Sequence, residues 1–144
     1  MDGTIANLYC VVNWLDYLLN ENPFPYENAK VMVNMSLLAR YIHKVQAKGI
    51  QVNIISWLSK KSTDNYSELV TNAKLNWLKQ HLPSVQFDNI YIIPYGTPKH
   101  ELLPSNEQNI LFDDEIDNLS NWVLSNCGYG VFPDSIFRIM KELV

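Results

Sequence analysis

The spacing of apolar residues along the chain predicts a series of amphipathic helices. Apolar positions recur at intervals of three and four over residues 5–21, which indicates a first helix. The proline-containing segment Asn22–Tyr26 then predicts an extended loop. A second helix is predicted from an Asn34 N-cap to Lys48, because Gly49 stands where helices commonly end. Further helices are expected over residues 66–82 and 115–125, and after an Asp134 cap.

Short runs of β-branched and aromatic residues alternate with these helices and predict strands. They cover residues 50–55, 90–93, 109–112 and 129–132. Strands separated by helices of this length form a parallel sheet with helices on both faces, joined by right-handed crossovers. We therefore expect a single α/β domain over residues 1–144 with a three-layer, Rossmann-like parallel sheet.

Composition narrows the class of protein. The 47% hydrophobic and 18% charged content suits one soluble globular domain. The net charge of −4 argues against a nonspecific nucleic-acid binder. Polar Asn13 and Asp16 interrupt the apolar stretch Leu8–Leu19, so we expect no membrane span. Cys10 and Cys127 lack metal-ligand or disulfide spacing, which is typical of reduced thiols in a cytoplasmic protein.

Several polar residues stand where a parallel sheet binds ligands, at the carboxyl ends of its strands. Ser56 and the pair Asp113-Asp114 each follow a predicted strand directly. A serine hydroxyl can donate to a phosphoryl oxygen, and carboxylate oxygens are ligands that Mg²⁺ prefers. Lys99 could add a positive charge. In Asp2-Gly3-Thr4, Gly3 permits a tight turn, and Gly3 and Thr4 would present helix N-terminal amides to a phosphate.

Each of these residues also has an ordinary structural explanation. Asp2-Gly3-Thr4 or Asp113-Asp114 could cap a helix, Ser56 could be a common strand-end hydroxyl, and Lys99 could be a solvated lysine. Trp57 stands beside Ser56, where its ring could stack on a ligand base or simply pack.

In chain order, these residues resemble the four motifs of haloacid dehalogenase-like (HAD) phosphatases. Met1-Asp2-Gly3-Thr4 is similar to the last four residues of the first motif, Asp-x-Asp-Gly-Thr. Ser56 stands at the second motif, Lys99 at the third, and Asp113-Asp114 at the acidic fourth motif. The resemblance covers nearly the whole chain. Its first motif, together with Phe112-Asp113-Asp114-Glu115, looks like short nucleotidase-like proteins of phages and bacteria.

The resemblance implies a role for each residue. Asp2 would be the general acid/base, Ser56 and Lys99 would hold the phosphoryl group, and Asp113, Asp114 and Asp2 would bind Mg²⁺. The family's nucleophilic Asp stands before the x position, which Met1 occupies here. The resemblance therefore implies a missing N-terminal strand and impaired or absent catalysis. We expect a homodimer or a partner complex to complete the sheet.

Two functions from different classes follow. The first is a phosphomonoesterase related to nucleotidases, acting on a phosphate ester or nucleotide. The second is a non-catalytic, phage-type binding protein that inhibits or bridges a macromolecular partner in a bacterial or phage-infected cell. The intervals between the motifs leave no room for a cap domain, so only residues 22–33, with Phe24 and Tyr26, form a candidate flap.

Overall fold

The parallel strands form two separate pairs in the computed structural model, which describes residues 1–105 and 108–144. Strand β3 (Asn53–Trp57) pairs with β4 (Asn89–Ile93), and β5 (Asn109–Phe112) pairs with β6 (Gly128–Val131). A short antiparallel pair joins β1 (Ala6–Asn7) to β2 (Lys30–Val31). Within the described ranges no ladder links β3 to β5, so the strands form pairs rather than the one continuous sheet that the pattern predicts.

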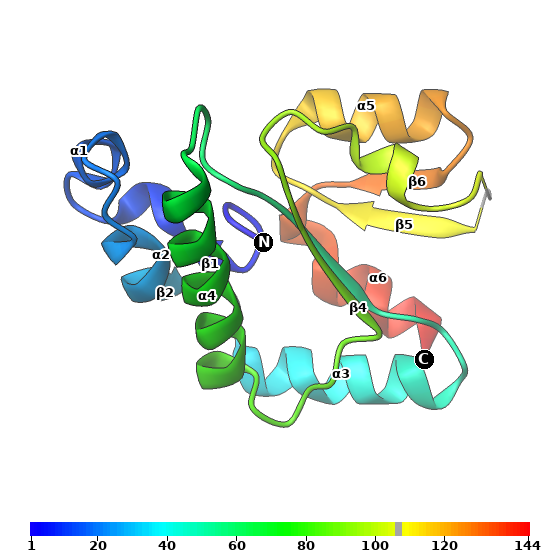
Figure 1. The fold of residues 1–144 in the computed structure, drawn as a ribbon. Helices are drawn as coiled ribbons and strands as arrows, with labels where there is room; N and C mark the ends of the chain where they lie inside the picture. The colour runs from blue at the N-terminus through cyan, green and yellow to red at the C-terminus, as the bar shows by residue number, and fades with distance from the viewer. Residues whose placement is uncertain (106–107) are drawn as a thin grey trace.

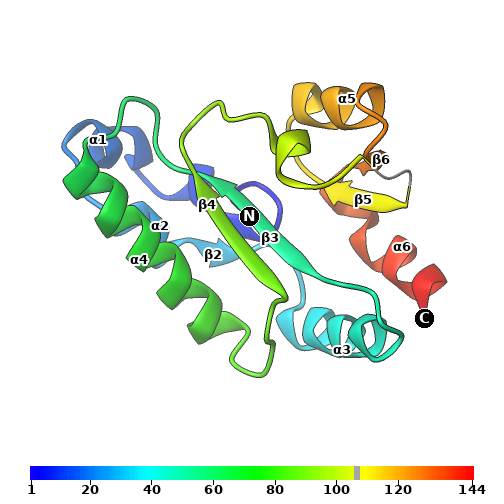
Figure 2. The same cartoon turned by 45° about the vertical axis from the view of Figure 1, so that its right-hand side comes forward.

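Helices surround these pairs and give a mixed α/β architecture, as predicted. The long helices are α3 (Met35–Ala47), α4 (Asp64–His81), α5 (Ile116–Leu124) and α6 (Ile136–Leu143). Figure 1 shows the β3–β4 pair in the middle, with α4 on one side and the β5–β6 pair with α5 on the other. Helices α3 and α6 lie together beside the amino ends of the central strands, and the turned view in Figure 2 agrees.

Local sequence signals explain several element boundaries. The Asn34 side chain accepts a hydrogen bond from Leu37 N–H at 3.0 Å and caps α3, as predicted. Gly49 follows that helix with a φ of 80°, a left-handed conformation that glycine adopts at little cost. Thr63 caps α4 through Tyr66 N–H, so this helix begins slightly earlier than predicted.

The predicted helix over residues 5–21 is wrong. The chain instead makes a turn, strand β1 and a short 3-10 helix (Leu8–Cys10), and only Trp14–Leu19 forms the helix α1. Asn13 adopts a left-handed φ of 58° immediately before α1, which breaks the helical path. The apolar period therefore does not describe a buried face, since Val12 and Leu19 are exposed.

Two further predictions differ from the structure for local reasons. Residues Phe24–Asn28 form the helix α2 rather than an extended loop, because Pro25 lies in the first turn, where its missing N–H costs nothing. The last helix has Ser135 as its N-cap instead of Asp134, which belongs to a preceding 3-10 turn (Pro133–Ser135).

Apolar side chains hold the two parallel pairs together. One buried cluster gathers residues from the N-terminus, α3, α4 and α6, including Met1, Ile42 and Trp77. Ile54 from β3 and Phe112 from β5 both pack against this cluster. The contact between the strand pairs is therefore made by side chains. None of the helices in the described ranges has the length and apolarity needed to cross a bilayer.

We predict that Gly128→Ala strongly destabilises the β5–β6 pair. Gly128 has a φ of 134°, and an added Cβ would lie 1.9 Å from the Asn109 carbonyl oxygen. We expect a loss of about 3 kcal/mol or more in the free energy of unfolding, measured by urea denaturation. Gly49→Ala is the matched control, because its positive φ adds strain of about 1 kcal/mol while no atom lies within 4 Å. Equal losses in both variants would contradict this account.

Candidate functional site

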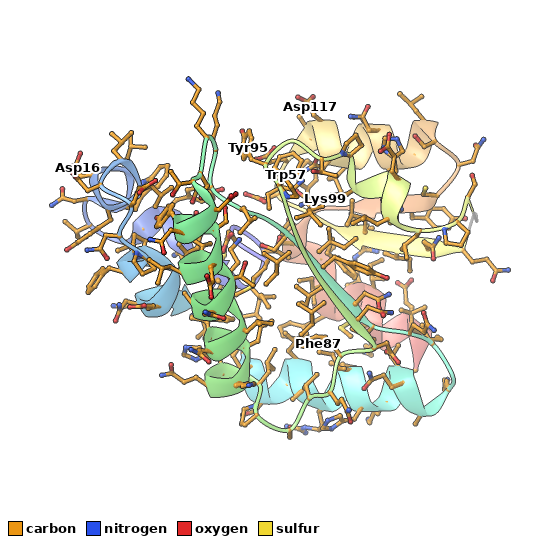
Figure 3. The ribbon with its side chains drawn as sticks, in the orientation of Figure 1. Asp16, Trp57, Phe87, Tyr95, Lys99 and Asp117 are labelled. Carbon is orange, nitrogen blue, oxygen red and sulfur yellow. The ribbon has the colours of Figure 1, made fainter. Side chains whose placement is uncertain are left out.

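Five of the residues predicted from the sequence line one small pocket: Asp2, Ser56, Lys99, Asp113 and Asp114. They come from the N-terminal turn, the end of β3, the 3-10 helix Lys99–Leu102 and the end of β5. Figure 3 places Lys99 and Trp57 together near the end of the β3–β4 pair that faces α5, whereas Phe87 lies at the opposite end. The cavity of about 40 Å³ has room for about three water molecules, a volume that suits a phosphoryl group but not a whole nucleotide.

The N-terminal turn presents Asp2 to this pocket. The Met1 carbonyl accepts hydrogen bonds from the N–H groups of Thr4, Ile5 and Ala6, at 3.1, 2.9 and 3.2 Å. Gly3 N–H donates to the Ala6 carbonyl at 2.9 Å, with a φ of 70° at Gly3. These amides are engaged within the turn and no helix starts here, so the predicted helix N-terminal phosphate site at Gly3 and Thr4 is not formed.

Lys74, which the sequence analysis did not single out, lies directly behind Asp2. It is fully buried on α4 and donates to Asp2 Oδ2 and Ser56 Oγ, both at 2.7 Å, and to the Trp57 carbonyl at 2.5 Å. The Tyr26 ring adds a cation–π contact, 5.0 Å from Nζ to the ring centroid. Burial lowers the pKa of Lys74, and the Asp2 carboxylate opposes this shift.

Lys99 forms the second ion pair of the site. Its Nζ donates to Asp113 Oδ2 at 2.5 Å and lies 5.0 Å from the centre of the Trp57 ring. Asp113 is buried and also accepts from Glu115 N–H at 2.9 Å and from the Asn118 amide at 3.3 Å. These contacts fix the Asp113 carboxylate at the end of β5.

Asp114 packs against the N-terminal turn. A Cβ on Gly3 would lie 2.0 Å from Asp114 Oδ2, so only glycine permits this approach. Desolvation, together with the neighbouring Asp113 carboxylate, raises the pKa values of both Asp114 and Glu115. Asp113, Asp114 and Glu115 therefore place three neighbouring acidic side chains in the lining of the pocket.

Aromatic side chains form the rim of the pocket. Tyr9 and Trp57 line it, and Tyr95 lies 5.0 Å from Trp57 between ring centroids. The Trp57 indole is held by a hydrogen bond of 2.8 Å from Nε1 to the Thr97 carbonyl. Tyr95 is half-exposed, and Lys60 Nζ lies 5.9 Å from its ring centre. Figure 3 shows Tyr95 beside Trp57 above Lys99.

The predicted flap is only partly exposed. Phe24 is 40% exposed, but Tyr26 is 4% exposed, and its hydroxyl forms a hydrogen bond of 2.6 Å with Ser59 Oγ. Helix α2, which carries both residues, packs against α4. Tyr26 is therefore buried rather than part of an exposed flap, and its ring contacts the Lys74 ammonium group instead.

The oxygen donors at the pocket match the ligand type that Mg²⁺ prefers, although the ion pairs occupy some of them. Asp2, Asp113 and Asp114 all contribute carboxylates to the lining. Asp2 and Asp113 are each paired with a lysine, and among residues 1–105 and 108–144 no group of three His, Cys, Asp or Glu side chains is arranged to hold a metal. A cation at this position would share Asp113 with Lys99.

A sequence signal for Lys74 was present. Val70, Ala73, Trp77 and Leu78 are buried at helical spacing, and Lys74 occupies the same face of α4. A lysine on an apolar face at this spacing indicates either a misassigned face or a buried cation with a partner. Leu69 has the apolar spacing of this helix but is 40% exposed, so the buried face is rotated toward Lys74.

No protein-family model, curated protein or solved structure matches this chain.

We predict that Asp114→Asn stabilises the protein at neutral pH but not at low pH. The pKa of Asp114 is raised above its ordinary value of 3.8, so the folded state binds this proton more tightly than the unfolded state does. Stability is therefore lost as the pH rises from 3.8 through the folded pKa, and asparagine avoids that loss. Urea denaturation at pH values on both sides of this window tests the prediction. Asp134→Asn on the exposed C-terminal turn is the control, and an equal gain there would contradict it.

Proposed function

We propose that this protein binds phosphate monoesters in a pocket of the HAD phosphatase type. The observation that carries the proposal is the convergence of Asp2, Ser56, Lys99 and Asp113 from four separate segments on one pocket. Their order along the chain resembles that of the HAD motifs. Ser56 and Asp113 lie at the carboxyl ends of β3 and β5, Lys99 begins the 3-10 helix that follows β4, and Asp2 lies in the N-terminal turn. In this assignment, Ser56 and Lys99 contact the phosphoryl oxygens and Asp2 is the acid/base residue.

The charges of the pocket support binding together with a cation. Asp2, Asp113, Asp114 and Glu115 all line it, whereas Lys99 is the lysine in its lining and Lys74 lies behind it. A dianionic phosphate entering such a site would meet repulsion unless further positive charge came with it. Mg²⁺ held by Asp113 and Asp114 would supply that charge and neutralise the phosphoryl oxygens.

The arrangement favours binding over rapid turnover. Of the three aspartates, Asp2 and Asp113 each hold an ammonium group, and Asp114 packs against Gly3. Attack on phosphorus requires a nucleophile in line with the leaving oxygen. The described contacts engage these carboxylates in other roles, so we propose slow or absent hydrolysis.

We predict that Ser56→Ala and Lys99→Met each weaken phosphate binding by about tenfold or more, because each removes a donor to a charged ligand. Calorimetry with inorganic phosphate and with a nucleoside monophosphate, each with Mg²⁺ or with a chelator, measures the effect. We expect the chelator to weaken binding in the wild type. Lys79→Met, an exposed lysine on α4, should bind as the wild type does. A folded wild type that binds neither ligand with Mg²⁺ would refute the proposed function.

The rim favours a nucleoside monophosphate as the ester. The pocket is too small for a base, so a base would lie outside it, against Trp57 and Tyr95. Stacking of a base on an aromatic ring contributes about 1–3 kcal/mol. The indole of Trp57 is already fixed by Thr97, so little side-chain entropy is lost when a base stacks on it.

We predict that Tyr95→Ala weakens binding of a nucleoside monophosphate by about fivefold or more and leaves binding of ribose 5-phosphate unchanged. The ratio of the two dissociation constants is the readout. Tyr129→Ala is the matched control, because Tyr129 is an exposed tyrosine on β6 outside the pocket. An equal effect on both ligands would show that Tyr95 contributes no base contact.

A second function is supported by a separate observation. The segment around α1 exposes several apolar side chains: Tyr9, Val12, Leu15, Leu19 and Phe24. Contiguous exposed apolar residues are typical of protein–protein contacts. A non-catalytic binding protein that uses this surface on a macromolecular partner is therefore the alternative, and failure of the folded protein to bind phosphate would favour it.

A further inference from the structure

Lys74 lies one layer behind the pocket, in a place that the proposed function does not use. It is fully buried and does not line the cavity. Burying an ammonium ion is strongly unfavourable unless its donors find partners. Its three N–H donors have three acceptors: Asp2 Oδ2, Ser56 Oγ and the Trp57 carbonyl.

The bond to Ser56 determines what that hydroxyl can do. A serine hydroxyl has one hydrogen to donate and lone pairs to accept with. Because Lys74 donates to Ser56 Oγ, the hydroxyl hydrogen must point to a different acceptor. Within the described ranges the structure records no such acceptor, and Ser56 lines the pocket. The hydroxyl hydrogen is therefore available to a ligand in the pocket.

The hydrogen bond from Lys74 to Asp2 likewise determines which carboxylate oxygen is available to a ligand. Lys74 holds Oδ2 at 2.7 Å, which fixes the rotation of the carboxylate and leaves Oδ1 for the pocket. The Asp2 side chain is 15% exposed, so this oxygen can reach a ligand. One ammonium group thus contacts both functional side chains.

We propose that Lys74 is the positioning residue of this pocket, fixing the Asp2 carboxylate and the Ser56 hydroxyl relative to each other by donating to both. The hydrogen bonds from Lys74 to Asp2 and Ser56 are present without a ligand. The effect of Lys74 on binding rests on the proposed phosphate-monoester function. A lysine that only stabilises the fold would not couple these two groups.

The first experiment needs no ligand. In isotopically labelled wild-type protein, we expect NMR to show a coupling across the hydrogen bond from Lys74 Nζ to the Asp2 carboxyl carbon. Lys74→Met should shift the Asp2 carboxyl signal and leave that of Asp113 in place, whereas Lys99→Met should do the reverse. The exposed Lys79→Met should move neither signal. Absence of the coupling in folded wild type overturns the proposal, whether or not the protein binds phosphate.

The second experiment is a double-mutant cycle on the binding of inorganic phosphate with Mg²⁺. Lys74→Met and Ser56→Ala should each weaken binding by about tenfold. The double variant should bind no more weakly than Lys74→Met alone, because Ser56 is already misdirected there. Additive losses would show that Lys74 does not orient Ser56.

The two experiments separate the proposals from each other. If Lys74→Met does not fold, the coupling in the wild type still decides the geometry. If the coupling is present but no phosphate binds, the proposed function fails and the positioning contacts stand.

Discussion

The fold of this molecule depends on supplying hydrogen-bond acceptors to one buried ammonium ion. Lys74 has no access to solvent, so the N-terminal turn, the end of β3 and helix α4 must come together to supply its acceptors. Removing one partner of such a group leaves an uncompensated charge, which typically costs about 3–5 kcal/mol. The hydrogen bonds that compensate the burial of Lys74 therefore also fix the side chains of Asp2 and Ser56. Site geometry and stability are coupled in this region.

The two lysines of the site have different surroundings and therefore different uses. Lys74 is enclosed by protein acceptors, whereas Lys99 has one carboxylate partner, Asp113, and lines the pocket under the Trp57 ring. Lys99 faces the pocket that an anion would enter, whereas Lys74 lies behind its lining. In the proposed function, Lys74 therefore positions the site residues and Lys99 contacts the ligand.

The sequence predicted the pocket better than it predicted the elements around it. Ser56 and Asp113 were predicted because polar residues that directly follow strands have a definite place in a parallel arrangement, whereas Lys99 was predicted as a positive charge in the order of the HAD motifs. The helix over residues 5–21 failed because apolar period alone cannot reveal the left-handed Asn13 or the turn that wraps around the Met1 carbonyl. The position of Lys74 on the apolar face of α4 was a signal of a buried cation, but it could not reveal the partners, which lie far away in the chain.

The separate pairing of the strands has a mechanical consequence. Ser56 belongs to the β3–β4 unit and Asp113 to the β5–β6 unit, and within the described residues no backbone ladder crosses between them. The width of the pocket is therefore set by side-chain contacts, namely the Lys99–Asp113 ion pair and the apolar cluster against which Ile54 and Phe112 pack. Substitutions in that apolar cluster would therefore change the width of the pocket, although the cluster contains none of the polar groups of the site.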